Sequence, residues 1–223
     1  MERHLHIVTG HYGSGKTEFS INLALALARA GDAVALADLD IVNPYFCSRG
    51  QRTALEAQGV RVIASAGGDA DLPAINPAVY ALLESGVCGI MDVGGDAAGA
   101  RVLGRFAQKI QAVEHELLCV LNFNRPETAT AEQAERYLRD IERSAKLRTT
   151  GLVNNTHLCG ETAARDVLRG AELAQAVSAR TGIPVRWHSF PRRLAGAVDL
   201  PPETLFPMDL LLKKPWETDC SEA

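Results

Sequence analysis

The chain has 223 residues, of which 47% are hydrophobic and 22% charged, and its formal net charge is −4 at pH 7. These values predict one folded domain with a full core and argue against a disordered chain. Because the charge is negative and no basic block occurs, we expect no nucleic-acid binding through a large positive face. No apolar run approaches the roughly 18 residues of a membrane-spanning helix, so we expect no membrane span.

The cysteines and the N-terminal residues bear on the cellular compartment in which the protein is expected. Five cysteines are scattered along the chain without a C-x-x-C pair. Residues 1–4 lead almost directly into the first predicted strand, so we expect no targeting segment. An odd number of cysteines without a signal peptide is typical of a reducing compartment, and we therefore expect a cytoplasmic protein.

Short apolar runs alternate with longer amphipathic runs along the whole chain. The short runs predict strands at Leu5–Thr9, Ala33–Ala37, Val60–Ala64, Val87–Asp92, Leu117–Asn122, Thr149–Asn154 and Pro184–His188. The longer runs predict helices at Lys16–Ala30, Ser48–Gln58, Ala78–Glu84, Ala98–Ala112, Ala131–Lys146 and Thr162–Thr181. This alternation predicts a single α/β domain over residues 1–223, with a mostly parallel sheet of about seven strands and helices on both faces. Residues 200–223, which are rich in proline, are expected to form an irregular tail.

The first predicted strand is followed by a glycine-rich segment with the pattern G-x-x-x-x-G-K-[ST]. Its residues are Gly10, His11, Tyr12, Gly13, Ser14, Gly15, Lys16 and Thr17. Glycines let backbone N–H groups wrap around a phosphate, and the helix that follows, with Glu18 in its first turn, offers its positive end to the same anion. Lys16 would reach the β- and γ-phosphates, and the Thr17 hydroxyl would bind Mg²⁺. The pattern therefore predicts a nucleotide site over residues 10–18.

Acidic residues follow two further strands. The second predicted strand is followed by Asp38 and Asp40, whose carboxylates repel each other unless a cation compensates, as a magnesium–nucleotide site does. The fourth ends at Asp92, which is placed to hold the Mg²⁺ shell, and the N–H of Gly95 could sense the γ-phosphate. The predicted catalytic residues are Lys16, Asp38 and Asp40, and the predicted metal ligands are Thr17, Asp38 and Asp92.

The ends of the later strands are candidates for the base pocket. Asn154 has donor and acceptor groups suited to a purine edge. Pro191 and Arg192 follow the seventh strand and are a second candidate for the base or its rim, whereas Arg125 is a surface arginine or a ligand or partner contact. Guanine sites in related folds usually have N-K-x-D, and residues 154–157 read N-N-T-H without that acid. We therefore expect ATP rather than GTP.

The phosphate loop, the segment Asp38-Leu39-Asp40-Ile41 and the segment Asp92-Val93-Gly94-Gly95-Asp96 together resemble the MinD/ParA/Mrp branch of the P-loop NTPases, a group with a CobQ/CobB/MinD/ParA nucleotide-binding domain. The resemblance spans most of the chain and implies a three-layer P-loop domain, Mg-ATP binding, slow hydrolysis and ATP-linked dimerisation. By motif it implies that Asp38 and Asp40 are the switch I acids, one of which positions the attacking water. It also implies that Asp92 is the Walker B acid and that Asn154 reads adenine.

The chain departs from this branch early in the phosphate loop. The branch often carries a signature lysine that reaches across a dimer, and this chain has His11 there. An imidazole is only partly charged near neutral pH, so it does not fully replace a lysine. We expect slow basal hydrolysis that an unknown protein partner stimulates. A homodimer is a further possible assembly.

Two functions fit these motifs. The first is a regulatory or delivery ATPase, which the switch-like Asp38, Asp40 and Gly95 favour. The second is an ATP-dependent ligase or kinase of the same fold that acts on a small molecule, similar to dethiobiotin synthetase or the cobyrinate amidases. In those enzymes the second strand usually leads into a substrate-binding lysine segment, which residues 38–45 do not provide. A nucleotide-binding scaffold without turnover stays open because His11 replaces the lysine.

Overall fold

The structure is a computed structural model that describes residues 5–40, 52–64, 82–83 and 86–212. Within these residues eight strands form one sheet in the order β3-β2-β4-β1-β5-β6-β7-β8, and every neighbouring pair is parallel. The strands are β1 (Leu5–Thr9), β2 (Val34–Leu39), β3 (Val60–Ala64), β4 (Cys88–Val93), β5 (His115–Leu121), β6 (Gly151–Asn154), β7 (Val185–Pro191) and β8 (Leu205–Met208). The predicted parallel α/β sheet is confirmed, with eight strands instead of about seven.

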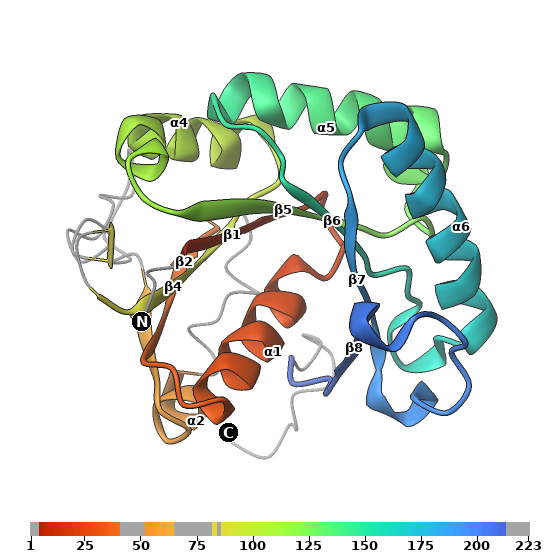
Figure 1. Ribbon diagram of the computed structural model, residues 1–223, viewed down its shortest axis with the longest axis horizontal. Helices are drawn as coiled ribbons and strands as arrows, with labels where there is room; N and C mark the ends of the chain where they lie inside the picture. The colour runs from red at the N-terminus through yellow and green to blue at the C-terminus, as the bar shows by residue number, and fades with distance from the viewer. Residues whose placement is uncertain (1–4, 41–51, 65–81, 84–85, 213–223) are drawn as a thin grey trace, which may run out of the picture.

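Helices cover both faces of this sheet and make the predicted three layers (Figure 1). They are α1 (Lys16–Arg29), α2 (Arg52–Glu56), α4 (Ala97–Gln111), α5 (Ala131–Ala145) and α6 (Ala164–Thr181). One hydrophobic cluster joins the sheet to α1 and α2, and two others join it to α4, α5 and α6. The predicted helix at Ala78–Glu84 lies almost entirely outside the described residues, as do the first residues of the one at Ser48–Gln58.

The central strands are buried on both faces, which explains why they read as continuous apolar runs. In β1, Ile7 packs into the cluster beneath α4 and Val8 into the cluster beneath α1, and both are fully buried. Neighbouring side chains of a strand point to opposite faces, so a sheet between two helical layers needs apolar residues at successive positions. β1 therefore lies inside the sheet between β4 and β5, and the glycine-rich segment follows its last residue, Thr9.

The proline-rich segment from residue 200 differs from its prediction as an irregular tail. It contains β8, which pairs in parallel with β7 at the edge of the sheet. Pro207 lies within this strand, and an edge strand tolerates proline because one of its sides has no partner strand. β8 is only four residues long and therefore gives a weak sequence signal. The residues after it, 209–212, are hydrogen-bonded to side chains of α1.

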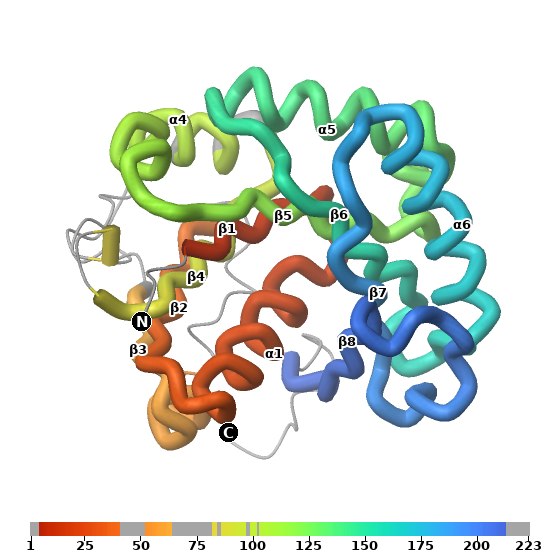
Figure 2. The backbone as a smooth tube through the Cα atoms, in the orientation of Figure 1, coloured from red at the N-terminus to blue at the C-terminus, as the bar shows by residue number. Residues whose placement is uncertain are grey.

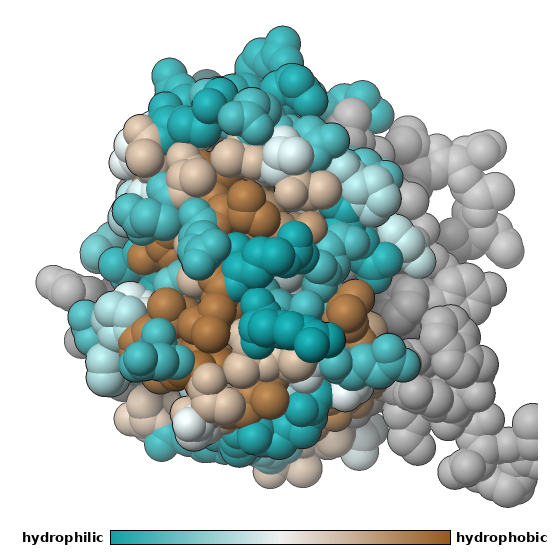
Figure 3. Space-filling model, turned by 90° about the vertical axis from the view of Figure 1, so that its right-hand side faces the viewer, coloured by the Kyte–Doolittle hydropathy of each residue, from teal (hydrophilic) through white to brown (hydrophobic). Residues whose placement is uncertain are grey.

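The exposed large hydrophobic residues of the described chain are few. They are Tyr12, Leu158 and Leu210, which follow β1, β6 and β8 and so lie toward the carboxyl ends of the parallel strands. The face seen in Figure 3 is largely hydrophilic with separate apolar patches. None of the described helices is long and apolar enough to cross a membrane.

Candidate nucleotide-binding site

The site lies at the carboxyl edge of the sheet, where β1 has β4 on one side and β5 on the other. From β1 the chain passes into α1 on one face, whereas from β4 it passes into α4 on the opposite face, as Figure 2 lets the reader follow. Connections that leave neighbouring strands toward opposite faces open a crevice at the strand ends, and ligands of α/β sheets bind there. The glycine-rich loop fills this position.

Two glycines give the loop its shape. Gly13 has φ 73° and Gly15 has φ 81°, in the left-handed region that glycine adopts without strain. Gly15 is also the residue before the first turn of α1. A side chain at Gly13 would overlap the guanidinium of Arg125, and one at Gly15 would overlap the amide of Asn155. Both the backbone conformation and the surrounding side chains therefore require glycine.

Side chains that follow β5 and β6 hold the outer side of the loop. The carbonyl oxygen of Gly13 accepts hydrogen bonds from Asn122 Nδ2 and Arg125 Nε, each at 3.1 Å. The carbonyl oxygen of Ser14 accepts one from Asn155 Nδ2 at 2.7 Å. In a trans peptide the C=O and the next N–H point to opposite sides, so the N–H of Gly15 points away from Asn155. This arrangement suits a loop whose N–H groups bind phosphate.

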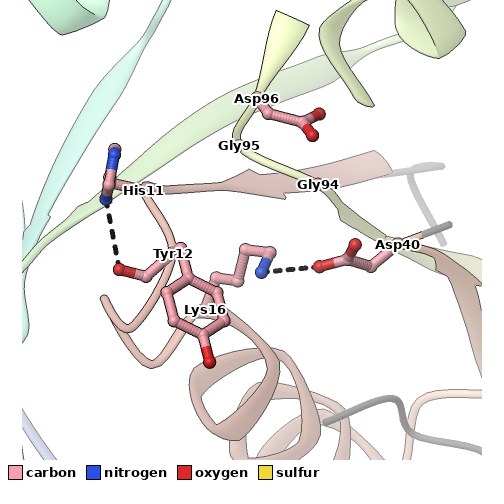
Figure 4. A pocket seen from close by; sticks show the side chains of 7 residues that line it. All are labelled: His11, Tyr12, Lys16, Asp40, Gly94, Gly95 and Asp96. Carbon is pink, nitrogen blue, oxygen red and sulfur yellow. Dashed lines mark hydrogen bonds and ion pairs between the residues drawn. The ribbon is translucent and has the colours of Figure 1, made fainter. Parts of the chain in front are cut away.

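An ion pair spans the inner side of the loop. Lys16 Nζ lies 2.7 Å from Asp40 Oδ2, and these residues are only 7% and 2% exposed (Figure 4). Asp38 and Asp92 are fully buried and lie opposite each other in the register of β2 and β4. Burial would lower the pKa of Lys16, but the charges of Asp92, Asp40 and Asp38 outweigh it and raise this pKa. One lysine therefore faces three buried acids.

The excess of acidic groups fits a bound cation. Burial raises the pKa of Asp92 to about 7, although Lys16 lowers it, while Asp38 raises it further. Asp92 Oδ1 accepts a long hydrogen bond from Ser20 Oγ at 3.4 Å, and Asp92 Oδ2 is buried without a hydrogen-bond partner among the described residues. The nearby hydroxyl of the buried Thr17 also lowers the pKa of Asp92, so a hydroxyl and a carboxylate lie together.

These donors are hard oxygen ligands of the kind that Mg²⁺ prefers. The described residues contain no group of three or more His, Cys, Asp or Glu side chains that could hold a metal ion. Mg²⁺ usually binds through one or two protein oxygens and completes its shell with substrate phosphates and water. The predicted ligands Thr17, Asp38 and Asp92 therefore fit Mg²⁺ as part of a metal–nucleotide site.

A cavity of about 380 Å³ opens in front of the ion pair. Its lining residues, drawn in Figure 4, are His11, Tyr12, Lys16, Asp40, Gly94, Gly95 and Asp96. They come from the phosphate loop, the end of β2 and the segment after β4. The volume lies at the low end of the roughly 300–1,000 Å³ of small-molecule pockets.

The comparisons with known proteins agree with this geometry. The family model of the CobQ/CobB/MinD/ParA nucleotide binding domain matches residues 5–170, most of the chain. The chain belongs to this family. It is thus a P-loop NTPase domain, as the motifs predict. No curated protein matches the chain in sequence.

Solved structures share the fold at low identity. The signal recognition particle receptor FtsY from Elizabethkingia anophelis is 22% identical with a TM-score of 0.54, and the match covers 84% of this chain and 58% of that one. Chloroplast FtsY from Physcomitrella patens is 22% identical with a TM-score of 0.56, over 84% and 58% of the two chains. A nucleotide-binding protein from Archaeoglobus fulgidus in complex with ADP is 15% identical with a TM-score of 0.52, over 88% and 85%. This P-loop domain thus spans less than two thirds of the FtsY chains.

Several predicted site residues of the P-loop domain lie away from the cavity. The carboxylate of Glu18 accepts hydrogen bonds from the backbone N–H groups of Leu211 at 2.7 Å and Leu212 at 3.2 Å, so it holds the chain after β8. Arg192 is exposed and forms an ion pair with Asp209 at 2.9 Å. Pro191 is buried at the end of β7.

Asn154 is also held by the protein itself. Its side chain is fully buried, and Nδ2 donates to the carbonyl oxygen of Val167 at 3.0 Å. Its Oδ1 accepts hydrogen bonds from the backbone N–H and the hydroxyl of Thr156. In this structure Asn154 ties β6 to α6, and its role in reading adenine stays a prediction.

Sequence reasoning missed the role of the residues that support the loop from outside, although it named Arg125 as a surface arginine or a ligand or partner contact. Asn122, Arg125 and Asn155 follow β5 and β6, and their position at the carboxyl edge was the available signal. His157 also packs against the loop, and burial, followed by the charge of Arg125, lowers its pKa to about 4. His157 is therefore neutral at pH 7.

Proposed function

We propose that this P-loop domain is a Mg-ATP-binding ATPase that acts as a nucleotide-dependent regulatory or delivery switch. The observation that carries the proposal is the buried ion pair of Lys16 and Asp40 at 2.7 Å. Phosphate-loop lysines bind the β- and γ-phosphates, so a triphosphate competes with Asp40 for the same ammonium group. Nucleotide binding then breaks the ion pair between Lys16 and Asp40, and the end of β2 responds to the nucleotide.

The site residues have distinct roles in the proposed hydrolysis. Lys16 and the N–H groups of residues 13–17 would hold the phosphates, while Thr17, Asp38 and Asp92 would hold Mg²⁺. When bound, Mg²⁺ neutralises the negative charge of the phosphate oxygens. Asp38 or Asp40 accepts a hydrogen bond from the attacking water and orients it. Because this chemistry depends on positioning and electrostatics, loss of the water-orienting acid slows hydrolysis more than it weakens binding.

Adenine is the proposed base. The similar folds include FtsY in complex with GDP and the Archaeoglobus fulgidus protein in complex with ADP, so the fold does not choose between the two bases. Guanine recognition usually needs a carboxylate at the fourth position of N-K-x-D, and this chain has His157 there. A neutral imidazole does not accept hydrogen bonds from both guanine N1 and N2 as a carboxylate does.

Assembly and location belong to the same proposal. We infer a cytoplasmic protein whose hydrolysis is slow until a protein partner stimulates it. His11, at the place of the signature lysine, contacts its own chain, with Nδ1 3.9 Å from Glu127 Oε2 and its ring against Tyr137. Because position 11 is a histidine, a homodimer that forms on ATP binding would not use the family's signature lysine at this position.

Phosphate release by purified protein tests the proposal. We expect Asp38→Asn or Asp40→Asn to lose at least about tenfold in rate while still binding ATP, because one acid orients the water. Asp199→Asn, which changes an exposed acid outside the cavity, is the matched control. His11→Lys should raise the rate if the missing lysine limits turnover.

If neither aspartate variant loses activity while ATP still binds, the switch assignment is wrong. Fast release by the isolated wild-type protein, rising further with a small-molecule acceptor, would instead favour a ligase or kinase.

A further inference from the structure

Tyr137 of α5 reaches the segment that follows β4. Its hydroxyl donates a hydrogen bond of 2.7 Å to the carbonyl oxygen of Gly95. Burial raises the pKa of Tyr137 well above its usual value of about 10, so this hydroxyl keeps its proton and remains a donor at physiological pH. The bond joins positions 42 residues apart in the sequence and brings a helix of the outer layer to the rim of the cavity.

The ring of Tyr137 contacts the other side of the same cavity. It packs edge-on against His11, with ring centroids 5.6 Å apart and an interplanar angle of 72°. His11 and Gly95 both line the cavity, from the phosphate loop and from the segment after β4. One side chain of α5 therefore touches both of these segments.

Gly95 itself is tightly enclosed. A Cβ atom at this position would overlap the carbonyl oxygen of Gly10 and the hydroxyl of Tyr137. The preceding residue is also a glycine, so this part of the backbone has unusual conformational freedom of its own. Holding it in one conformation needs contacts from outside the segment.

The helix that carries Tyr137 is well anchored. Its first turn has a capping box, in which Thr130 and Gln133 satisfy each other's backbone N–H groups. Leu138, next to Tyr137, is fully buried in the cluster that joins α5 to the sheet. Tyr137 thus projects from a fixed element toward a segment with little intrinsic rigidity.

We propose that Tyr137 is a positioning residue that holds Gly95 so that its backbone faces the γ-phosphate, and so couples α5 to the nucleotide state. The inference rests on the proposed ATPase function and adds a regulatory contact to the same site. The donor that faces the γ-phosphate is the backbone N–H of Gly95. A donor that already points at the place where negative charge develops accelerates a reaction, because the protein does not have to reorganise at the moment of reaction. Tyr137 itself touches no reacting atom.

The direct test is Tyr137→Phe, which keeps the ring against His11 and removes only the hydroxyl. A hydrogen bond of this kind contributes enough for a roughly three- to tenfold decrease in kcat for phosphate release. The Kd of Mg-ADP should stay within about twofold, because ADP lacks the γ-phosphate. The affinity ratio of a non-hydrolysable ATP analogue to ADP should fall by a similar three- to tenfold.

Thr204→Val is a matched control, because it removes an exposed hydroxyl that donates to the carbonyl oxygen of Pro201, also at 2.7 Å. Hydrogen–deuterium exchange of residues 92–96 adds a readout that needs no nucleotide, and it should be faster in Tyr137→Phe and unchanged in Thr204→Val. A merely structural role predicts instead that thermal stability and the affinities for ATP analogue and ADP fall together.

The outcomes separate this inference from the proposed function. If the wild-type protein binds nucleotide but Tyr137→Phe leaves kcat, the affinity ratio and the exchange of residues 92–96 unchanged, the role of Tyr137 is overturned and the ATPase proposal stands. A parallel loss of stability and of both affinities would also overturn it. If the wild-type protein binds no nucleotide, both fail.

Discussion

Replacement of Lys16 by methionine tests the electrostatic account of the site without any ligand. Lys16→Met keeps the aliphatic part of the side chain but removes the charge that faces Asp38, Asp40 and Asp92. We expect the nucleotide-free variant to fold and to be less stable than wild type. The reason is that three buried acids then lie together without their compensating cation.

The geometry sets the size of this effect. Lys16 is 7% exposed and its ion pair with Asp40 measures 2.7 Å. Removing one partner of a buried pair costs about 3–5 kcal/mol, which corresponds to a decrease in Tm of roughly 6–20 °C for a domain of this size. Asp40→Asn in the same chain should recover about 0.5–3 kcal/mol, the range of coupling between contacting residues.

The loss of stability caused by Lys16→Met should also depend on pH. The pKa of Asp92 is already raised to about 7, and loss of Lys16 removes the charge that lowers it. A carboxyl whose folded pKa exceeds its unfolded value of about 3.9 binds protons better in the folded state, so stability rises as pH falls between these values. The difference between Lys16→Met and wild type should therefore shrink from pH 8 to pH 5.

Urea unfolding of wild type, both single variants and the double variant gives the full cycle. Asp199→Asn, in an exposed position, controls for loss of an acid elsewhere. The reasoning would be refuted if the effects of Lys16→Met and Asp40→Asn were additive, or if the deficit of Lys16→Met were the same at pH 5 and pH 8.

Three further predictions concern neighbouring parts of the site. Because the folded pKa of His157 is about 4 and its unfolded pKa about 6.5, wild type should lose about 1–3 kcal/mol of stability relative to a His157→Asn variant as pH falls across this window; the same pH slope for both proteins in urea unfolding would contradict this. Glu18→Ala should cost roughly 1–3 kcal/mol and speed proteolysis after residue 208, since two backbone N–H groups lose their acceptor; unchanged digestion would show that the contact is unimportant. Gly95→Ala should reduce phosphate release more than tenfold because its Cβ would overlap the Gly10 carbonyl oxygen, whereas Gly160→Ala, with open space around it, should not; equal rates in the two variants would count against the tight packing at Gly95.

The phosphate loop and the acids opposite it could be predicted because their chemistry is local in sequence. Residues 10–17 carry their own pattern, and Asp38 and Asp92 end apolar strands, so the parallel topology alone brings them to one edge. The contact between Lys16 and Asp40 follows from this placement. The sheet itself could be predicted for the same reason, since buried parallel strands read as apolar runs.

The supporting contacts could not be predicted because they depend on packing between distant segments. Asn155 donates a hydrogen bond to the phosphate loop, whereas its neighbour Asn154 donates to α6. The two residues are adjacent in sequence, so the sequence alone does not show which of them faces the loop. Glu18 follows the loop directly in sequence, but the helical turn directs it to the chain after β8. β8 is a four-residue edge strand, and no local sequence pattern predicts its pairing with β7.

Binding of nucleotide measured by calorimetry tests the central claim most directly. We predict that wild-type protein binds Mg-ATP, that GTP competes only at higher concentration, and that Lys16→Ala retains its fold by circular dichroism and loses most of the ATP affinity. A folded Lys16→Ala variant with unchanged ATP affinity would contradict the assignment of this loop as the nucleotide site. Displacement of ATP by lower concentrations of GTP would contradict the proposed adenine preference.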